Sequence, residues 1–169
     1  MNEIDRLWAG WRSSYVSSGG ATGDASHGHC VFCGILALDV PEDDTNIVRR
    51  GELVTVMLNA YPYGTGHVLV MPNRHVAMLD DLTPEESSAL WQGINHAVVA
   101  IRSAYQPNGL NVGFNLGAGS GAGIPEHLHA HVLPRWKADT NFITAVANAK
   151  VLPEPLDVTW QKLRDAWPS

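Results

Sequence analysis

Three histidines alternate with apolar residues in the segment His127-Leu128-His129-Ala130-His131-Val132-Leu133-Pro134. Because successive side chains of a β-strand point to opposite faces, this spacing predicts that all three imidazoles project from one face of one strand. Leu128, Ala130 and Val132 would then pack behind them. Crowded imidazoles lower one another's pKa, so at least one would stay neutral near pH 7 and act as a nucleophile or a metal ligand. The alternative is a hydrogen-bonded or solvated histidine cluster without a chemical role.

The composition is that of a globular domain. The 169 residues are 45% apolar and 17% charged, which suits one hydrophobic core and is unlike a disordered chain. The net charge of −6 argues against an electrostatic nucleic-acid surface. No apolar run reaches membrane-spanning length, and Met1-Asn2-Glu3-Ile4-Asp5 shows no signal-peptide pattern. We therefore expect a cytoplasmic protein that binds neither nucleic acid nor membranes.

Strand signals are clear in the first half of the chain. Ile47 to Arg50 and Leu53 to Leu58 flank Gly51-Glu52 and predict a β-hairpin. His67 to Met71 predicts a buried strand that ends at Pro72, after a tight loop.

The second half predicts one long helix and two further strands. Thr83-Pro84-Glu85-Glu86 combines an N-cap residue, a proline at the first helical position and acidic residues in the first turn. The helix should end by Pro107 and be followed by strands at Gly109 to Leu116 and Leu128 to Pro134. Strands on both sides of one long helix, joined mostly by hairpins, indicate a single α+β domain with an antiparallel sheet.

The two ends of the chain are expected to differ from this central domain, which we place at residues 30–150. Residues 1–29 combine a predicted short amphipathic helix, Ile4 to Tyr15, with a flexible loop rich in Gly, Ser and Ala. Residues 151–169 form a C-terminal extension that is expected to pack on the core. The alternative is that this extension lines the pocket of a partner copy.

The chain has two cysteines, Cys30 and Cys33, with two residues between them. This spacing suits a shared metal ion or a redox pair. A thioredoxin-type pair usually encloses Gly or Pro at a strand-to-helix junction, whereas Val31-Phe32 lies between these cysteines, after a loop-like stretch. We therefore interpret the pair as a knuckle that follows a flexible linker, with two buried, inert thiols as the alternative.

A glycine-rich stretch, residues 115–123, lies directly before the histidine segment. Alternating glycines allow backbone N–H groups to approach a ligand closely and to form a concave anion site. The stretch is neither a Walker loop nor a dinucleotide-binding fingerprint, and alone it would indicate only a flexible hairpin loop. Its position beside the histidines favours phosphate binding.

Together these motifs resemble the signature of the histidine-triad (HIT) family of nucleotide hydrolases and transferases. The signature is His127-x-His129-x-His131 followed by Val132-Leu133, and the resemblance extends to Asn59, Gly66-His67-Val68-Leu69-Val70, Arg74-His75, Asn111-Val112-Gly113 and Asn115. The wider pattern is similar to a bacterial branch close to diadenosine tetraphosphate phosphorylases and hydrolases, through Leu7-Trp8, Leu58-Asn59-x-Tyr61-Pro62-Tyr63, Glu126 to Trp136, and Asp139 to Phe142. The resemblance implies a HIT-like antiparallel sheet of about five strands, one long helix, a short N-terminal helix and a homodimer.

The resemblance also implies roles for individual residues. His129 would attack the α-phosphorus of a nucleotide and form a covalent nucleotidyl-histidine, while its other ring nitrogen donates to the carbonyl of His127. His131 would donate to a phosphoryl or leaving-group oxygen, and His67 belongs to the same catalytic set. Asn59 would hydrogen-bond the ribose, or else cap a turn. The phosphates would be held by Asn115 and the backbone amides of Gly121, Ala122 and Gly123.

The implied reaction is cleavage of a nucleoside phosphoanhydride, with a diadenosine polyphosphate as substrate and Mg²⁺ accompanying it. The acceptor would be inorganic phosphate in a phosphorylase and water in a hydrolase; the resemblance favours phosphate. The alternatives are a phosphoramidase or nucleotidyltransferase of the same family, a non-catalytic nucleotide sensor, and a metalloenzyme whose ligands are the three triad histidines. The last is disfavoured because the Cα atoms of His127 and His131 would stand about 13 Å apart along a strand.

Zinc-containing relatives suggest a role for the cysteines. In those proteins a C-x-x-C pair, a distant histidine and the first triad histidine bind zinc, and the matching positions here are Cys30, Cys33, His75 and His127. Four such ligands would form a closed tetrahedral site, which is structural rather than catalytic. His27 and His29 are competing ligands in the preceding loop.

The chain departs from the family pattern just before the triad. Many members carry Gln, Ser or Thr at the positions of Gly123 and Ile124, where the side chain contacts phosphate. Here only backbone amides are offered, so we expect the leaving-group choice or the rate to differ. Ser120 could take over this contact if the glycine loop folds back.

Overall fold

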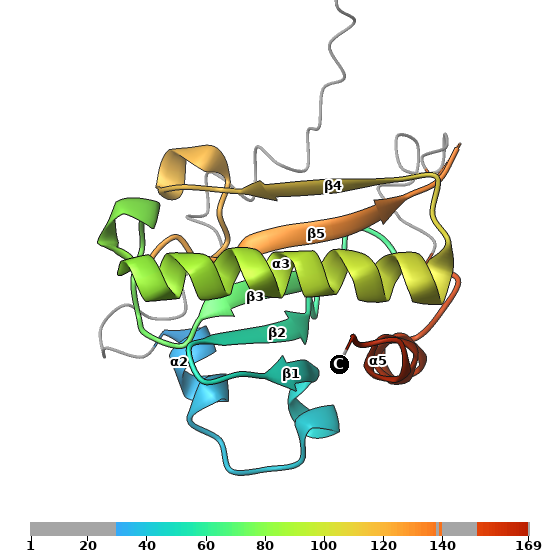
Figure 1. Cartoon of the computed structure of the whole chain (residues 1–169), viewed down its shortest axis with the longest axis horizontal. Coiled ribbons are helices and arrows are strands. Elements are labelled where there is room, and N and C mark those ends of the chain that lie inside the picture. The colour runs from blue at the N-terminus through green and yellow to red at the C-terminus, as the bar shows by residue number, and fades with distance from the viewer. Residues whose placement is uncertain (1–29, 138, 140–151, 169) are drawn as a thin grey trace, which may run out of the picture.

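The computed structural model describes residues 30–137, 139 and 152–168, and it has an antiparallel sheet with a long helix across one face (Figure 1). The strands are β1 (Ile47–Arg50), β2 (Val54–Leu58), β3 (Val68–Pro72), β4 (Gly109–Phe114) and β5 (Ala130–Arg135). They lie in the order β1-β2-β3-β5-β4, so β5 inserts between β3 and β4. The predicted α+β fold with a five-stranded sheet is confirmed. The N-terminal helix and loop predicted within residues 1–29 lie outside the described residues.

The long helix, α3 (Pro84–Tyr105), has the boundaries that its end signals predict. The Thr83 hydroxyl accepts from the Glu86 N–H at 3.2 Å, and the Glu86 carboxylate accepts from the Thr83 N–H at 2.9 Å. This reciprocal capping box satisfies two donors that the first turn leaves unpaired. The helix ends at Gln106, whose φ of 46° places it in the left-handed region, and Pro107 follows.

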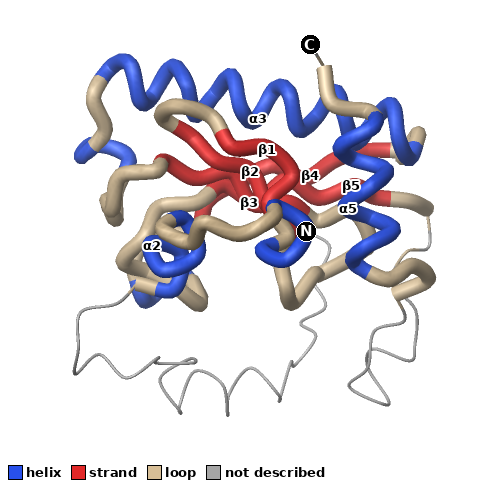
Figure 2. The backbone as a smooth tube through the Cα atoms, turned by 90° about the horizontal axis from the view of Figure 1, so that it is seen from below, coloured by secondary structure: helices blue, strands red, loops and turns tan. Residues whose placement is uncertain are grey.

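Alternation along the strands divides the core into two layers. Val68 and Val70 pack under α3, whereas Leu69 and Met71 face the other side, together with Phe32 of the short helix α2 (Val31–Leu36). Figure 2 shows α3 on one side of the sheet and α2 on the other. His131 lies opposite Leu69 in the β3–β5 register, so its imidazole belongs to the α2 side.

The C-terminal helix α5 (Leu156–Asp165) packs on the core, as expected for the extension. Leu163 is fully buried, and the Trp160 indole N–H donates to the Ile47 carbonyl at 2.7 Å. α5 therefore lies against β1 at one edge of the sheet. The boundaries of the central domain and of the C-terminal extension remain predictions. Three short 3₁₀ helices complete the described elements: η2 (Glu42–Thr45), η3 (Leu79–Asp81) and η4 (Ala118–Ser120).

The strand boundaries in the histidine region differ from the predicted ones where residues form hydrogen bonds outside the sheet. β5 begins at Ala130 rather than at Leu128, because the residues before it are held by the loop that follows β3: the Leu128 N–H donates to the Val76 carbonyl at 2.6 Å. β4 ends at Phe114 rather than at Leu116, and Asn115 turns toward His131. No helix in the described part of the chain could cross a membrane. Cytoplasmic location remains a prediction.

Candidate functional site

The three triad histidines lie close together on the sheet face opposite α3. The ring centroids of His129 and His131 are 5.0 Å apart, and the Phe32 ring meets His129 at 5.2 Å and His127 at 5.5 Å, edge to face in both cases. Leu128, Ala130 and Val132 are buried in the α3 layer, as the alternation predicts.

His129 has one ring nitrogen assigned by a backbone contact. Its Nδ1 lies 2.8 Å from the His127 carbonyl oxygen, which can only accept, so Nδ1 carries the proton. Burial lowers the pKa of His129, and the ring is therefore neutral near pH 7. A neutral ring protonated at Nδ1 has its lone pair on Nε2. His129 is thus a ready nucleophile.

A second chain of contacts fixes the proton on His131. The Tyr63 N–H donates to His67 Nδ1 at 3.1 Å, so the His67 proton sits on Nε2, 3.0 Å from His131 Nδ1. His131 therefore accepts at Nδ1 and carries its own proton on Nε2. Burial, and then the proximity of His129, lower the pKa of His131 to about 4, so this ring is also neutral.

The side-chain amide of Asn115 lies 3.3 Å from His131 Nε2. Because two donors cannot share a hydrogen bond, either the amide oxygen faces this ring or the ring proton goes to another acceptor. The His131 ring centroid lies 5.0 Å from that of His129, so the His131 Nε2 proton could be donated in a hydrogen bond to a phosphoryl oxygen bound at His129.

Tyr63 is a site residue that the sequence reasoning left without a role. Its ring lies 4.7 Å from His67 and stacks on His131 at 5.6 Å between centroids. The Tyr61-Pro62-Tyr63 run before Gly66-His67 was a signal for it, because an aromatic residue next to a buried histidine often covers the ring. The Tyr63 ring therefore covers the rings of His67 and His131.

Gly66 allows the tight turn that places His67 in the site. Its φ of +77° lies in the left-handed region, and a Cβ there would meet Pro134 at 3.0 Å and Tyr105 at 3.2 Å. Only glycine fits this turn and this close approach. Asn59 caps the same loop: its side-chain oxygen accepts from the Tyr61 N–H at 2.9 Å. The turn-capping role is thus observed, and a ribose contact remains a prediction.

The glycine-rich stretch folds into the η4 turn. Gly117 and Gly121 flank this turn with φ values of 73° and 82°. The Ser120 hydroxyl donates to the Gly117 carbonyl at 2.7 Å, so it is engaged within its own turn rather than directed at the triad. Phosphate binding by Gly121, Ala122 and Gly123 remains a prediction.

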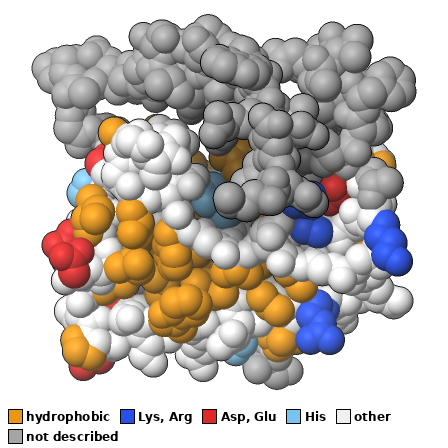
Figure 3. Space-filling model, turned by 90° about the horizontal axis from the view of Figure 1, so that it is seen from above, with side chains coloured by type: hydrophobic (Ala, Val, Ile, Leu, Met, Phe, Trp, Pro, Cys, Tyr) orange, Lys and Arg blue, Asp and Glu red, His pale blue; other side chains and the backbone are white. Residues whose placement is uncertain are grey.

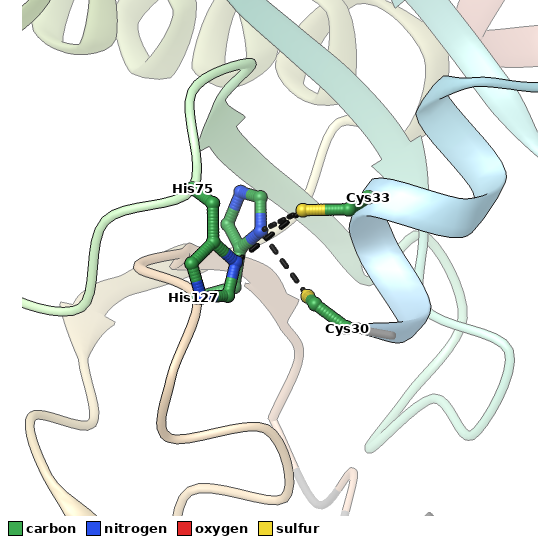
Figure 4. A group of neighbouring side chains, drawn as sticks. All are labelled: Cys30, Cys33, His75 and His127. Atoms are coloured by element: carbon green, nitrogen blue, oxygen red, sulfur yellow. Dashed lines mark hydrogen bonds between the residues drawn. The ribbon is translucent and has the colours of Figure 1, made fainter. Parts of the chain in front are cut away.

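Next to the triad lies a cluster that can hold a metal ion (Figure 4). The ligand atoms of its four residues all lie within 4.8 Å of one another, and these are the four predicted from the zinc-containing relatives: Cys30, Cys33, His75 and His127. His127 Nδ1 lies 3.3 Å from Cys30 Sγ, and His75 Nδ1 lies 3.3 Å from Cys33 Sγ. The competing ligands His27 and His29 lie outside the described residues.

The donor set has the chemistry that a metal requires. His127 Nε2 lies 2.9 Å from the Pro72 carbonyl, so it carries the proton and leaves the Nδ1 lone pair facing the two sulfurs. Burial and the neighbouring Cys30 raise the pKa of the Cys33 thiol, so this thiol would lose its proton only as a metal binds. Two thiols and two imidazoles could therefore coordinate one metal ion tetrahedrally.

The cysteine pair itself is not the knuckle that we predict from its flanking residues. Cys30 stands at the N-cap of α2 and Cys33 lies in its first turn, so the pair opens a helix. The apolar residue between them, Phe32, is buried against the histidines and anchors this helix to the sheet. Within the described residues, His129 and His131 take no part in a metal-binding cluster, which counts against a metal shared by the whole triad.

Comparisons with known proteins identify the family of the chain. A model of the HIT domain matches residues 40–138. The chain is 37% identical to the AP-4-A phosphorylase of Mycobacterium tuberculosis H37Rv over 167 residues, which cover 98% of this chain and 86% of that protein. The chain belongs to the HIT family. A second relative, the asymmetrical bis(5'-nucleosyl)-tetraphosphatase of Schizosaccharomyces pombe, is 35% identical over 95 residues, which cover 56% of this chain and 52% of that protein.

Solved HIT structures share the fold. A zinc-bound histidine triad family protein from Mycobacterium smegmatis superimposes with a TM-score of 0.65 at 27% identity. The match covers 81% of this chain and 91% of that protein. A HIT-like protein from Bartonella henselae, 22% identical with a TM-score of 0.65, supports the same fold.

Proposed function

We propose that this HIT protein cleaves nucleoside phosphoanhydrides through a covalent nucleotidyl-His129, with a diadenosine polyphosphate as substrate. The observation that carries the proposal is the contact between His129 Nδ1 and the His127 carbonyl, which leaves Nε2 as an unprotonated nucleophile. The AP-4-A phosphorylase and the tetraphosphatase among its relatives support the substrate class.

The first step would be in-line attack of His129 Nε2 on the α-phosphorus. The new N–P bond forms as the bond to the bridging oxygen breaks, and the remaining nucleotide leaves with that oxygen and the bond electrons. In the second step an oxygen of the acceptor displaces Nε2. With diadenosine tetraphosphate the leaving group is ATP; inorganic phosphate then yields ADP, whereas water yields AMP.

The polar groups around His129 would stabilise the transition state. Negative charge spreads over the phosphoryl oxygens, so donors positioned in advance lower the barrier. The His131 Nε2 proton, oriented through His67, is one such donor, and the Asn115 amide lies beside it. Backbone amides of Gly121 to Gly123 would complete the phosphate contacts, and Mg²⁺ would arrive with the substrate.

We also propose that the ion held by Cys30, Cys33, His75 and His127 is zinc with a structural role. Two sulfurs and two imidazole nitrogens suit zinc, and a zinc-bound relative shares the fold. The site would tie α2 and the loop after β3 to His127, two residues before the nucleophile.

The homodimer expected from the family has a surface that would suit it. β4 is an edge strand, and it carries Val112 with 43% of its surface exposed. Trp91 of α3, 52% exposed, packs edge to face on Phe114 beside it. Apolar side chains gather in the view from the β4 side (Figure 3). A strand edge that pairs with no further strand among the described residues, next to exposed apolar side chains, favours pairing with a second copy.

Product analysis with diadenosine tetraphosphate, with and without inorganic phosphate, tests the proposed reaction. ADP plus ATP formed only with phosphate would identify a phosphorylase. AMP plus ATP in both tubes would identify a hydrolase. No product in either tube, together with tight nucleotide binding, would contradict catalysis and favour the nucleotide sensor.

A further inference from the structure

The loop after β3, residues 73–76, touches a different part of the fold at each residue. The Asn73 amide donates to the carbonyls of Gly51 and Glu52 at 3.0 and 2.9 Å, and its oxygen accepts from the Thr55 hydroxyl at 2.7 Å. The start of the loop is thereby fixed to the β1–β2 hairpin.

The end of the loop is fixed to the nucleophile segment. Val76 is buried in the α3 layer, and its carbonyl accepts from the Leu128 N–H at 2.6 Å. Leu128 lies between His127 and His129 in the sequence. Between these two anchors stand Arg74 and the metal ligand His75.

Arg74 is clamped by a two-pronged ion pair. Its Nε and Nη2 donate to the two carboxylate oxygens of Glu86 at 2.7 and 2.6 Å, and Nη2 also donates to the Asp81 carbonyl at 2.8 Å. Such a fork fixes direction as well as distance, because two parallel hydrogen bonds allow little rotation. The Glu86 side chain is only 9% exposed and is itself held by the capping box of α3. This partner is therefore a rigid one.

His75, by contrast, is an exposed residue whose ring nitrogen faces Cys33 Sγ at 3.3 Å. Figure 4 shows it reaching the cluster from this loop while both cysteines come from α2. The direction of its side chain depends on the backbone between Arg74 and Val76.

We infer that Arg74 and Glu86 are positioning residues of the metal site, which hold His75 against Cys33 before an ion binds. A ligand ordered in advance loses less conformational freedom when the metal arrives, and metal affinity rises accordingly. Breaking the clamp would leave Asn73 and Val76 anchored, so the fold would persist while His75 gained freedom. The cost would appear in metal affinity.

Zinc affinity of the metal-stripped, reduced full-length chain tests this inference, measured by competition with a chromophoric chelator. Glu86→Gln is the informative variant, because glutamine retains the capping box and loses the charge. We expect about a tenfold weaker Kd for zinc in Glu86→Gln and in Arg74→Met, the size typical of losses at groups supporting metal ligands. Asp139→Asn is the matched control, because it breaks the similar Arg135–Asp139 fork elsewhere.

A double-mutant cycle separates positioning from a general loss of structure. In a His75→Ala chain, which lacks the positioned ligand, adding Glu86→Gln should weaken zinc binding no further. An equal additional loss in that background would overturn the inference, as would wild-type affinity in a folded Glu86→Gln chain. Arg74→Lys, which retains the charge without the fork, replaces Arg74→Met if that variant fails to fold, and it should also bind zinc more weakly.

Discussion

At the scale of single residues, His127 connects two sites. Its Nδ1 faces the cysteine sulfurs, its Nε2 donates to the Pro72 carbonyl, and its own carbonyl accepts from His129, the proposed nucleophile. The two ring nitrogens and the carbonyl of His127 therefore contact three different parts of the fold. A shift of its backbone would disturb the metal cluster and the nucleophile tautomer together.

Replacing the nucleophile should remove turnover and leave the fold intact. We expect His129→Ala to lower kcat for diadenosine tetraphosphate by at least about a thousandfold, because no other group can form the nucleotidyl intermediate. His96→Ala, a change on α3, is the control and should leave kcat unchanged. Near-normal activity of His129→Ala with unaltered circular dichroism would exclude the covalent mechanism.

The rate should depend on pH through the neutral histidines. Burial lowers the pKa of His129 and brings that of His131 to about 4, so both rings are neutral above pH 6.5. As the pH falls further, toward these lowered pKa values, protonation of His129 removes the lone pair, and protonation of His131 near pH 4 breaks its contact with His67. We expect kcat/KM to be level from pH 8 through 6.5 and to fall only in more acidic solution. A rate that rises toward pH 5 would contradict these assignments.

At the scale of elements, α3 serves the site through its first turn. Glu86 completes the capping box and also clamps Arg74 in the loop that carries His75. The Arg74 guanidinium holds the pKa of Glu86 at about 2, so this carboxylate stays charged throughout the working range of pH. The first turn of α3 therefore stabilises the fold and also orders the loop that carries His75.

Loss of the cap should be measurable as lost stability. We expect Thr83→Ala to lower the free energy of unfolding by about 1 kcal/mol, because the Glu86 N–H loses its acceptor at the helix start. Urea denaturation followed by circular dichroism measures the change. Ser88→Ala, an exposed position inside the same helix, should cost nothing; a similar loss there would assign the effect to something other than the cap.

At the scale of the whole molecule, the two sheet edges differ. α5 packs against β1 and its Trp160 donates to the Ile47 carbonyl, whereas β4 pairs with β5 on one side and is the outer strand among those that the structure describes. Unpaired strand edges invite a further strand unless they are covered or charged. The β4 edge is therefore where we place the proposed dimer contact.

A charge on that edge should separate the copies. We expect Val112→Lys to shift the protein from dimer to monomer in size-exclusion chromatography with light scattering, because a buried ammonium has no partner there. Val158→Lys, an equally exposed apolar position on α5, is the control and should leave the mass unchanged. A wild-type monomer, or a dimer that survives Val112→Lys, would place the contact elsewhere or exclude it.

The sequence alone determined the features that depend on local periodicity and end signals. Alternation in the histidine segment placed Leu128, Ala130 and Val132 in the core, and Thr83-Pro84 marked the start of α3, because these patterns act over a few neighbouring residues. The likeness to known families supplied the four ligands of the metal cluster, which no local rule could connect across 97 residues.

Only the tertiary structure decided which distant groups meet. Tyr63 covers His131, and Arg74 reaches Glu86. The two cysteines lie at the start of a helix rather than in a knuckle. Each of these features depends on how loops pack against the sheet. The proton position on His131 likewise follows from His67, which lies 64 residues earlier in the chain. Long-range contacts of this kind are set by the packing of the whole domain, which the order of residues along the chain does not display.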